Sequence, residues 1–334
     1  MTYRRRVQVT GGGTFLVTLP KEWAERMGVG QGTEMVLIPN DSGAMMVVPE
    51  GARDRNRCTL AMTGRERVHL QRDIIARYIA GYDVIEVVGE RIGPEGRRLV
   101  RDIAQSLVGV EVLGETQGVV ALHCVANVRD FPAPQTIRRI LEIADAMWED
   151  ALTAFLTRDE ELARDVEERD GDVDRLVLLV ARQFGLLLRD LIVEEEVGMS
   201  RFQFLHYHTV ADQLERVADH AVKVSHVART VTDVPPSRYA DRVRKMAVAS
   251  QNVVREAVAA FIERDVARAN RVLSGKGTKE TVTDWMQEAI RDQRANALPL
   301  TLLHDSLHRC REHGFNIAET ALDAAVPTLG SGSI

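Results

Sequence analysis

Four acidic side chains in the C-terminal half of the sequence are spaced so that they could bind one metal ion together. Asp170 and Asp174 stand four residues apart, and so do Glu215 and Asp219. Residues at this spacing share one face of a helix, so each pair can present two carboxylates to a common point. Two such helices facing each other would form a cage of four carboxylates for a divalent cation. The alternative is that each pair belongs to a solvated acidic face.

The part of the chain that carries these carboxylates contains an internal repeat. Residues 154–163 (AFLTRDEELA) align with residues 260–269 (AFIERDVARA), and residues 214–226 align with residues 307–319. The offsets are 106 and 93 residues, and similarity at such a spacing predicts two consecutive copies of one helical unit. Apolar spacing predicts three long helices in each copy, namely 135–157, 160–191 and 200–231, then 237–263, 265–294 and 299–325.

The second copy offers a weaker metal site. His308 and Glu312 occupy the positions of the glutamate and aspartate on the last helix of the first copy. A histidine and a glutamate four residues apart can still bind a metal ion. Lys276 occupies the position of Asp170, however, and a lysine there would repel a cation. A second metal cluster is therefore in doubt.

The N-terminal fifty residues alternate between apolar and polar side chains, as short strands do. The strands expected are 6–10, 14–19, 34–39 and 44–49, with a short helix at 21–27. Three glycines, Gly11 to Gly13, lie between the first two strands and fit a hairpin turn. A phosphate-binding loop is the alternative, but no helix start with Lys-Ser or Lys-Thr follows at the required spacing. So few elements bury little surface, which favours strand exchange between two chains.

Residues 52–131 alternate between strand and helix patterns in the order strand, helix, strand, helix, strand, strand. This order predicts a small α/β domain with a mixed sheet. His123 and Cys124 are adjacent on a predicted strand and so face opposite ways, which argues against a shared metal. We interpret the domain as a structural connector, with ligand sensing as the alternative.

Composition places the chain among globular proteins and excludes several classes. The net charge is −6, but residues 1–51 carry five basic and five acidic groups, and the acidic excess lies in residues 131–334. Three separated cysteines predict reduced thiols rather than disulfides, which favours a cytoplasmic location. The longest apolar stretch, 176–193, contains charged residues, so no membrane insertion is expected. No Ser-His-Asp set, Cys-His pair or P-loop is recognisable, so an enzyme is not expected.

Residues 4–49, RRRVQVTGGGTFLVTLPKEWAERMGVGQGTEMVLIPNDSGAMMVVP, resemble the AbrB/MazE/SpoVT-type swapped-hairpin DNA-binding domain. The LPKEW helix, the G-x-x-x-G spacing and the final apolar strand ending in proline carry the resemblance. It implies a homodimeric barrel whose DNA contacts are Arg4, Arg5, Arg6 and Lys21. A dimer would bring six of these arginines together, and neutralisation of phosphates supplies most non-specific affinity for DNA. The alternative is that the arginines are solvated charges at a strand edge.

Residues 135–325, with LERVADHA at 214–221, resemble the PhoU family of phosphate-uptake regulators. The resemblance implies tandem three-helix bundles whose E(D)xxxD motifs gather iron or zinc. The segments Asp170–Asp174 and Glu215–Asp219 match that motif. It also implies a role in phosphate transport and signalling, with a phosphate transporter or sensor protein as partner, rather than catalysis.

The sequence thus predicts a mainly α protein with an N-terminal swapped-hairpin β-barrel, a small α/β connector domain and two tandem three-helix bundles. The expected boundaries are 1–51, 52–131, 132–234 and 235–326, with a tail at 327–334. The predicted function is a DNA-binding transcriptional regulator of phosphate uptake. The alternative is a metal-containing adaptor that docks on a phosphate transporter or sensor and uses the barrel only for dimerisation.

Overall fold

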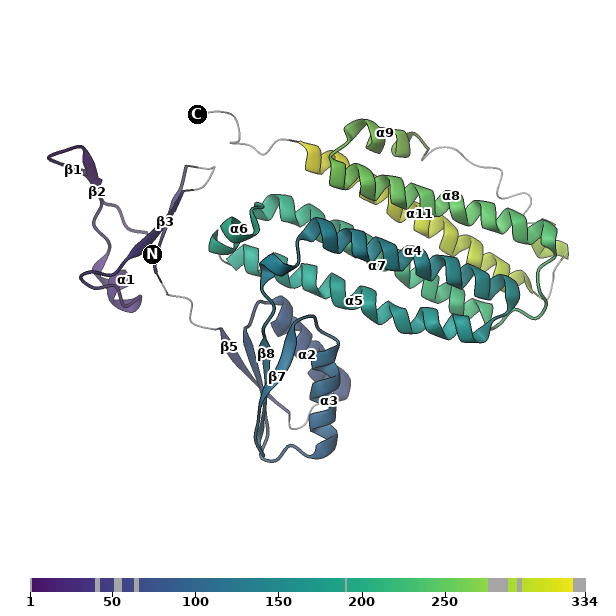
Figure 1. The fold of residues 1–334 in the computed structure, drawn as a ribbon, viewed down its shortest axis with the longest axis horizontal. Helices are drawn as coiled ribbons and strands as arrows, with labels where there is room; N and C mark the ends of the chain where they lie inside the picture. Colours follow the sequence, from purple (N-terminus) through teal and green to yellow (C-terminus); the bar gives the residue numbers. More distant parts are fainter. Residues whose placement is uncertain are drawn as a thin grey trace. The chain divides into compact units, whose positions relative to one another are not determined.

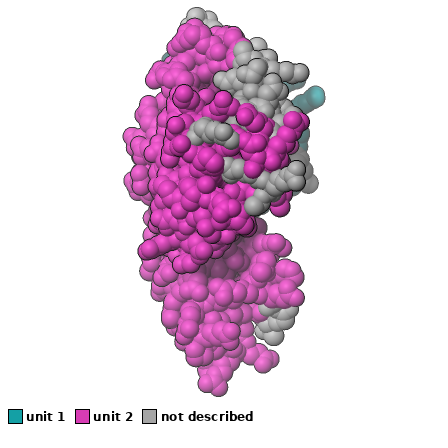
Figure 2. Space-filling view, turned by 90° about the vertical axis from the view of Figure 1, so that its right-hand side faces the viewer, with its two compact units in different colours: residues 1–55, 329–334 teal, residues 56–328 magenta. Residues whose placement is uncertain are grey.

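The computed structural model describes residues 2–39, 43–50, 56–62, 66–189, 191–275, 288–292 and 296–326. Residues 1–55 belong to one compact unit and residues 56–328 to the other, and the two are described separately (Figure 2). The second unit holds the predicted α/β domain and all the long helices (Figure 1). The mainly α fold class with a small N-terminal strand region is confirmed.

The first unit consists of two antiparallel strand pairs and one short helix. Its elements are β1 (Gln8–Thr10), β2 (Thr14–Leu16), α1 (Lys21–Arg26), β3 (Met35–Pro39) and β4 (Met45–Pro49). The three glycines form the turn between β1 and β2, and Gly12 and Gly13 adopt positive φ of 119° and 87°. The hairpin reading of the glycines is therefore confirmed, and the strands are shorter than the apolar pattern predicted.

The β1–β2 hairpin buries none of its own side chains within this chain. Every residue of both strands is exposed, including Val9 at 65% and Phe15 at 74%. Only Ile38 and Pro49 are buried within the described strands of this unit. An exposed valine and phenylalanine on a short hairpin indicate a surface that a second polypeptide would cover.

The α/β domain has one sheet with two helices packed on it. Its elements are β5 (Arg57–Ala61), α2 (Arg67–Ile79), β6 (Val84–Val88), α3 (Pro94–Gln105), β7 (Val110–Glu115) and β8 (Val119–Cys124). The strand order is β5-β6-β8-β7, with β5 parallel to β6 and the other pairs antiparallel. Leu60, Ile85 and Leu122 from the strands share a core with Ile74 and Val100 from the helices. The predicted mixed sheet is confirmed.

The long helices follow the predicted repeat closely. The first copy comprises α4 (Ala133–Thr157), α5 (Glu160–Arg189), α6 (Leu191–Val197) and α7 (Arg201–Ala228). The second comprises α8 (Ser237–Glu263), α9 (Val266–Ser274) and α11 (Ala297–Ala325), with residues 288–292 also helical. The prediction of a single helix over 265–294 is wrong, because α9 ends at Ser274 with its C-cap at Gly275; residues 276–287 and 293–294 lie outside the described part of the chain. No described helix is long and apolar enough to cross a bilayer.

Both copies use the same turn between their first two helices. Arg158 (φ 61°) and Arg264 (φ 55°) end α4 and α8 in the left-handed region, which non-glycine residues seldom adopt. The aspartate that follows each arginine accepts a hydrogen bond from the first turn of the next helix, from Leu162 N at 3.0 Å or from Arg268 N at 2.9 Å. The repeated Arg-Asp pair therefore fixes the same corner twice.

α7 and α11 lie side by side and antiparallel at the centre of the helical region (Figure 1). Gln213 Oε1 lies 2.9 Å from His313 Nδ1 and accepts a hydrogen bond from Asn316 Nδ2 at 3.0 Å. The rings of His220 and His313, which occupy equivalent positions in the two copies, are 5.8 Å apart. Equivalent residues meet in this way only when the copies are related by an approximate two-fold axis. One apolar core runs through both copies.

The α/β domain is fixed to α5 through the end of α2 (Figure 1). Arg182, 6% exposed, donates to the backbone carbonyls of Tyr78 at 2.7 Å and Tyr82 at 2.9 Å. Gly185 permits this approach, since a Cβ at that position would lie 2.2 Å from the carbonyl oxygen of Ile79. The buried arginine thus adds a second donor to the Tyr78 carbonyl, which also accepts from Gly81 N at 3.0 Å, and supplies a donor to the Tyr82 carbonyl just beyond the helix.

Candidate functional site

The structure brings the carboxylates of the first copy into one electrostatic group. α5 carries Asp170 and Asp174, and α7, which packs beside it, carries Glu215 and Asp219. Partial burial, followed by repulsion from Asp174 and Asp219, raises the pKa of Asp170 to about 6. The same causes raise the pKa of Asp174 and of Glu215. The two helical pairs are therefore close enough for their charges to interact, with burial as the larger cause of the raised pKa values.

The arrangement of these side chains is less close than a metal centre requires. Among the described residues, no group of three or more His, Cys, Asp or Glu side chains converges on a point that could hold one metal ion. The donor chemistry suits a cation, because repelling carboxylates are stabilised by positive charge. A metal ion at this position would require the side chains to turn toward one another, so metal binding stays a prediction.

The second candidate metal group is only partly within the described residues. His308 and Glu312 lie on α11, at positions equivalent to Glu215 and Asp219 on α7. Lys276 and Glu280, the counterparts of the two aspartates on α5, fall outside the described part of the chain. Metal binding by His308 and Glu312 therefore stays a prediction.

The predicted DNA contacts are exposed in the first unit. Arg4, Arg5 and Arg6 precede β1 and are exposed, and the Arg5 guanidinium lies 5.9 Å from the centre of the Tyr3 ring. Lys21, at the start of α1, pairs with Glu25 at 3.6 Å. The three arginines are exposed and could contact a polyanion, whereas the ammonium group of Lys21 is already paired with a carboxylate.

The first unit also contains an open apolar groove of about 550 Å³. Its described lining comes from α1, from the strand β4 and from the segments before α1, and consists of Tyr3, Leu19, Pro20, Trp23, Arg26, Met45 and Val47. Aromatic and methionine side chains in a groove of this kind are typical of protein–protein contact.

Sequence reasoning did not single out the residues that meet between the copies. His220 and His313 lie at the α7–α11 contact, with Arg216, Lys223 and Arg309 close enough to affect their charge. The alignment at an offset of 93 residues already places His220 opposite His313 and Arg216 opposite Arg309. The repeat therefore identifies these residues as equivalent in the two copies. Only the antiparallel packing of α7 on α11 shows that the equivalent residues lie next to each other.

The fold therefore defines a chain with a strand-hairpin unit, an α/β domain and a double helical repeat, and comparison with known families shows what two segments of it are similar to. Residues 137–228 match the PhoU domain family, and residues 8–54 match the MazE family of bacterial antitoxins, described as antidote-toxin recognition. The chain thus joins a MazE-type N-terminal segment to a PhoU-type helical region.

Individual relatives match the helical region in part. The phosphate-specific transport system accessory protein PhoU homolog of Xylella fastidiosa is 25% identical over 45% of this chain and 65% of its own length. The homolog from Pseudomonas aeruginosa is 28% identical over 38% of this chain and 52% of its own length. The chain thus spans between about half and two thirds of the curated relatives it matches.

Two solved structures are similar to part of this chain. The crystal structure of PhoU from Pseudomonas aeruginosa has a TM-score of 0.48 at 23% identity and covers 57% of this chain and 94% of its own. The phosphate transport system regulatory protein PhoU from Streptococcus pneumoniae has a TM-score of 0.47 at 15% identity, and covers 57% of this chain and 92% of its own.

Proposed function

We propose that this chain is a PhoU-like regulator of phosphate uptake or phosphate signalling that acts as a homodimeric, DNA-binding transcriptional regulator. The observation that carries the proposal is the presence, in one chain, of a MazE-type segment and a PhoU-type helical region. The curated relatives are named as accessory proteins of phosphate-specific transport. The role proposed is regulatory rather than catalytic.

Dimerisation through the first unit is supported by its exposed apolar side chains. Val9 and Phe15 are largely exposed on a hairpin that packs against no other described element of its own unit closely enough to be buried. A second copy that interleaved its hairpin would cover these side chains and remove free strand edges. The dimer therefore supplies the core that one copy of this unit lacks.

DNA contact is supported by the position of Arg4, Arg5 and Arg6. A dimer carries six of these side chains, all exposed before β1. The acidic excess of the whole chain lies in residues 131–334, outside the first unit. Phosphate contacts by exposed arginines give affinity that falls steeply with salt.

In this proposal the helical region responds to the phosphate signal, and the first unit changes its binding to DNA as a result. The helical region contacts a phosphate transporter or sensor protein, and this contact alters how strongly the dimer occupies DNA. The α/β domain lies between the two parts in sequence and is held on α5 by Arg182 and Gly185. A change in the helices that carry the carboxylates would therefore reach the domain that precedes them in the chain.

We extend the proposal to a metal ion, iron or zinc, at Asp170, Asp174, Glu215 and Asp219, with His308 and Glu312 as a second pair of donors. Support comes from the burial and, after it, the repulsion from neighbouring carboxylates that raise the pKa of Asp170 and Glu215. When bound, the ion would supply positive charge that holds α5 and α7 together. The residues of this chain contribute carboxylate oxygens and one imidazole.

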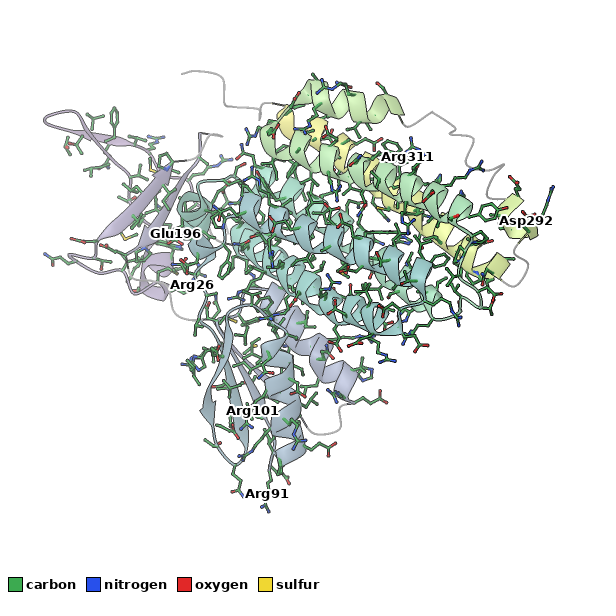
Figure 3. All side chains as sticks on the ribbon, turned by 45° about the vertical axis from the view of Figure 1, so that its right-hand side comes forward. Arg26, Arg91, Arg101, Glu196, Asp292 and Arg311 are labelled. Atoms are coloured by element: carbon green, nitrogen blue, oxygen red, sulfur yellow. The ribbon has the colours of Figure 1, made fainter. Side chains whose placement is uncertain are left out.

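The test of DNA binding is gel retardation of promoter DNA from phosphate-uptake genes at low and moderate salt, using the full chain. We expect retardation that weakens with salt and is lost when Arg4, Arg5 and Arg6 are changed to Ala. The matched control changes Arg72, Arg91 and Arg98 to Ala, three exposed arginines of the α/β domain, of which Arg91 lies at its far end (Figure 3). Equal binding by both triple variants, or no binding by the wild type, would overturn the proposal.

A second function is supported by the apolar groove beside Trp23. Its lining fits a protein segment better than a phosphate backbone, and residues 1–51 have no net charge. In that case the chain is an adaptor that uses the first unit only to dimerise. Two measurements separate these functions. If the wild type binds no DNA, and light scattering shows that Phe15→Ser converts the dimer to a monomer, the adaptor function is favoured.

A further inference from the structure

The sheet of the α/β domain has one face that no described helix covers. α2 and α3 both pack on the other face (Figure 1), in a core that includes Leu60, Val87 and Leu122 from the strands. Successive side chains of a strand point to opposite faces, so the residues between these core positions form the uncovered face. We call it the open face, and it consists of three cross-strand rows, namely Arg57, Val84, His123 and Glu111, then Thr59, Glu86, Ala121 and Gly114, then Ala61, Val88 and Val119.

The open face is accessible mainly along its two edge strands. On β5, at one edge, Arg57, Thr59 and Ala61 are all exposed. On β7, at the other edge, Glu111 is exposed. In the two middle strands Val84 and Ala121 are already buried by their neighbours. A partner of this face would therefore gain most of its contacts at the edges.

The two edges of the open face carry opposite charges. The first row begins with Arg57 on β5 and ends with Glu111 on β7. These residues are three strand spacings apart, about 14 Å, so they do not pair within one sheet. Arg57 Nη1 lies 3.4 Å from Glu86 Oε1, yet 60% of the Arg57 side chain is exposed. Glu111 forms no ion pair with any described residue, so each edge can accept a further charge of opposite sign.

A second copy of the same face fits this charge arrangement. If two sheets pack face to face about a two-fold axis parallel to the strands, each row meets its own row in reverse order. Arg57 then lies opposite Glu111 of the second copy, and the pair occurs twice. Both side chains are long enough to meet across the offset of roughly 30° between packed sheets.

The other two rows are complementary to themselves in the same arrangement. In the second row Glu86 lies opposite Ala121 of the second copy, so a long side chain meets a small one. In the third row Val88 lies opposite Val119, which makes this part of the contact apolar. A two-fold axis along the middle row would instead place Glu86 opposite Glu86, and like charges repel. The charges therefore favour the axis parallel to the strands.

We propose that the open face is an interface between two copies of this chain, in which Arg57 of each copy contacts Glu111 of the other. The inference rests on the proposed homodimer, because the face alone is small. Four strands about 4.8 Å apart and about 17 Å long cover roughly 300 Å² per copy, against about 800 Å² for a standard stable interface. Dimerisation through the first unit raises the effective concentration of one α/β domain around the other, so a small second contact can form.

The test is fluorescence-detected sedimentation velocity of the full chain from nanomolar to micromolar concentration, which measures the dissociation constant of the dimer. We expect Arg57→Glu and Glu111→Arg each to weaken dimerisation about tenfold, because two attractions become two repulsions. Arg57→Glu/Glu111→Arg in one chain should return the dissociation constant toward the wild-type value, since the pair is formed again with its signs exchanged. The two positions are about 14 Å apart within one sheet, so this rescue reports a contact between copies.

The matched control is Arg98→Glu, the same charge reversal at an exposed arginine of α3, on the covered side of the sheet. Its dissociation constant should equal that of the wild type, and thermal unfolding of every variant shows whether the domain is intact. A monomeric wild type would overturn both this interface and the proposed homodimer. A wild-type dimer that neither reversal weakens, a double variant no tighter than the single ones, or equal weakening by Arg98→Glu would overturn the sheet interface alone.

Discussion

Arg182 on α5 donates a hydrogen bond of 2.7 Å to the backbone carbonyl of Tyr78, which lies in the last turn of α2. The same guanidinium lies 5.0 Å from the centre of the Tyr78 ring and 3.5 Å from Asp83. One buried side chain of the helical repeat therefore holds the end of a helix in the preceding domain. The α/β domain and the first helical copy belong to the same compact unit, and Arg182 links them.

Changing Arg182 to Met should lower the free energy of unfolding by about 2 kcal/mol or more, because the Tyr82 carbonyl would lose its donor, the Tyr78 carbonyl would lose one of two donors, and Asp83 would lose its ion pair. Urea denaturation measures the change, and hydrogen exchange should show faster opening of residues 66–126. The control is Arg189→Met, an exposed arginine whose contact with the domain is with the Tyr82 ring at 5.6 Å. A similar cost for both variants would contradict the role assigned to Arg182.

Asp170 should make stability depend on pH in a predictable direction. Its pKa is raised from 3.8 to about 6, so the native state holds this proton more tightly than the unfolded chain. Its contribution to stability therefore falls as pH rises from 3.8 to about 6, and the penalty is fully present above that range. Asp170→Asn should raise the Tm at pH 7.5 in metal-free buffer and have no such effect below pH 4.

The matched control for this titration is Asp172→Asn, on the same helix and exposed. Differential scanning calorimetry of all three proteins between pH 4 and pH 8 gives the comparison. If Asp170→Asn and Asp172→Asn show the same change of Tm at every pH, burial and the neighbouring carboxylates do not raise the pKa of Asp170.

Metal binding at the carboxylates is checked by elemental analysis of protein purified without chelator. We expect iron or zinc in the wild type and its loss in Glu215→Ala/Asp219→Ala, because two of the four oxygen donors are removed. Asp172→Ala should retain the metal. Wild-type protein without metal, or equal metal in the double variant, would remove this part of the proposal.

The two left-handed arginines should respond alike to glycine. Arg158→Gly and Arg264→Gly should each stabilise the protein by roughly 0.5 kcal/mol, because glycine adopts positive φ without steric cost but loses more entropy on folding. Arg164→Gly, in the exposed interior of α5, should instead destabilise it by about 1 kcal/mol. Thermal unfolding of the three variants distinguishes the signs, and stabilisation by Arg164→Gly would contradict this account.

Local sequence signals predicted the helices and strands well where caps and turns mark their ends. The helix predicted at 237–263 is observed as α8 at the same residues, because Pro236 precedes it and the Arg-Asp turn ends it. The order of strands in the sheet was not predictable in this way. β8 lies between β6 and β7, and such pairing depends on contacts distant in sequence rather than on local pattern.

The candidate sites show the same division. Helical spacing predicted that Asp170 would lie near Asp174 and Glu215 near Asp219, and the structure adds that the two pairs repel each other. The spacing of residues in the sequence does not determine the side-chain rotamers that direct the carboxylate oxygens. Coordination of a metal ion by these carboxylates could therefore not be predicted. The partners of Arg182 lie about a hundred residues away in sequence, and no periodicity connects them.

The approximate two-fold axis between α7 and α11 gives this single chain the internal geometry of an isologous dimer, with one difference. In a true homodimer every substitution appears twice, so the two sides of the axis can never be distinguished experimentally. Here His220 and His313 are encoded by separate codons, and either can be changed while its counterpart remains as an internal reference. The duplicated chain thus allows one side of a nearly symmetric interface to be substituted while the other side stays wild type.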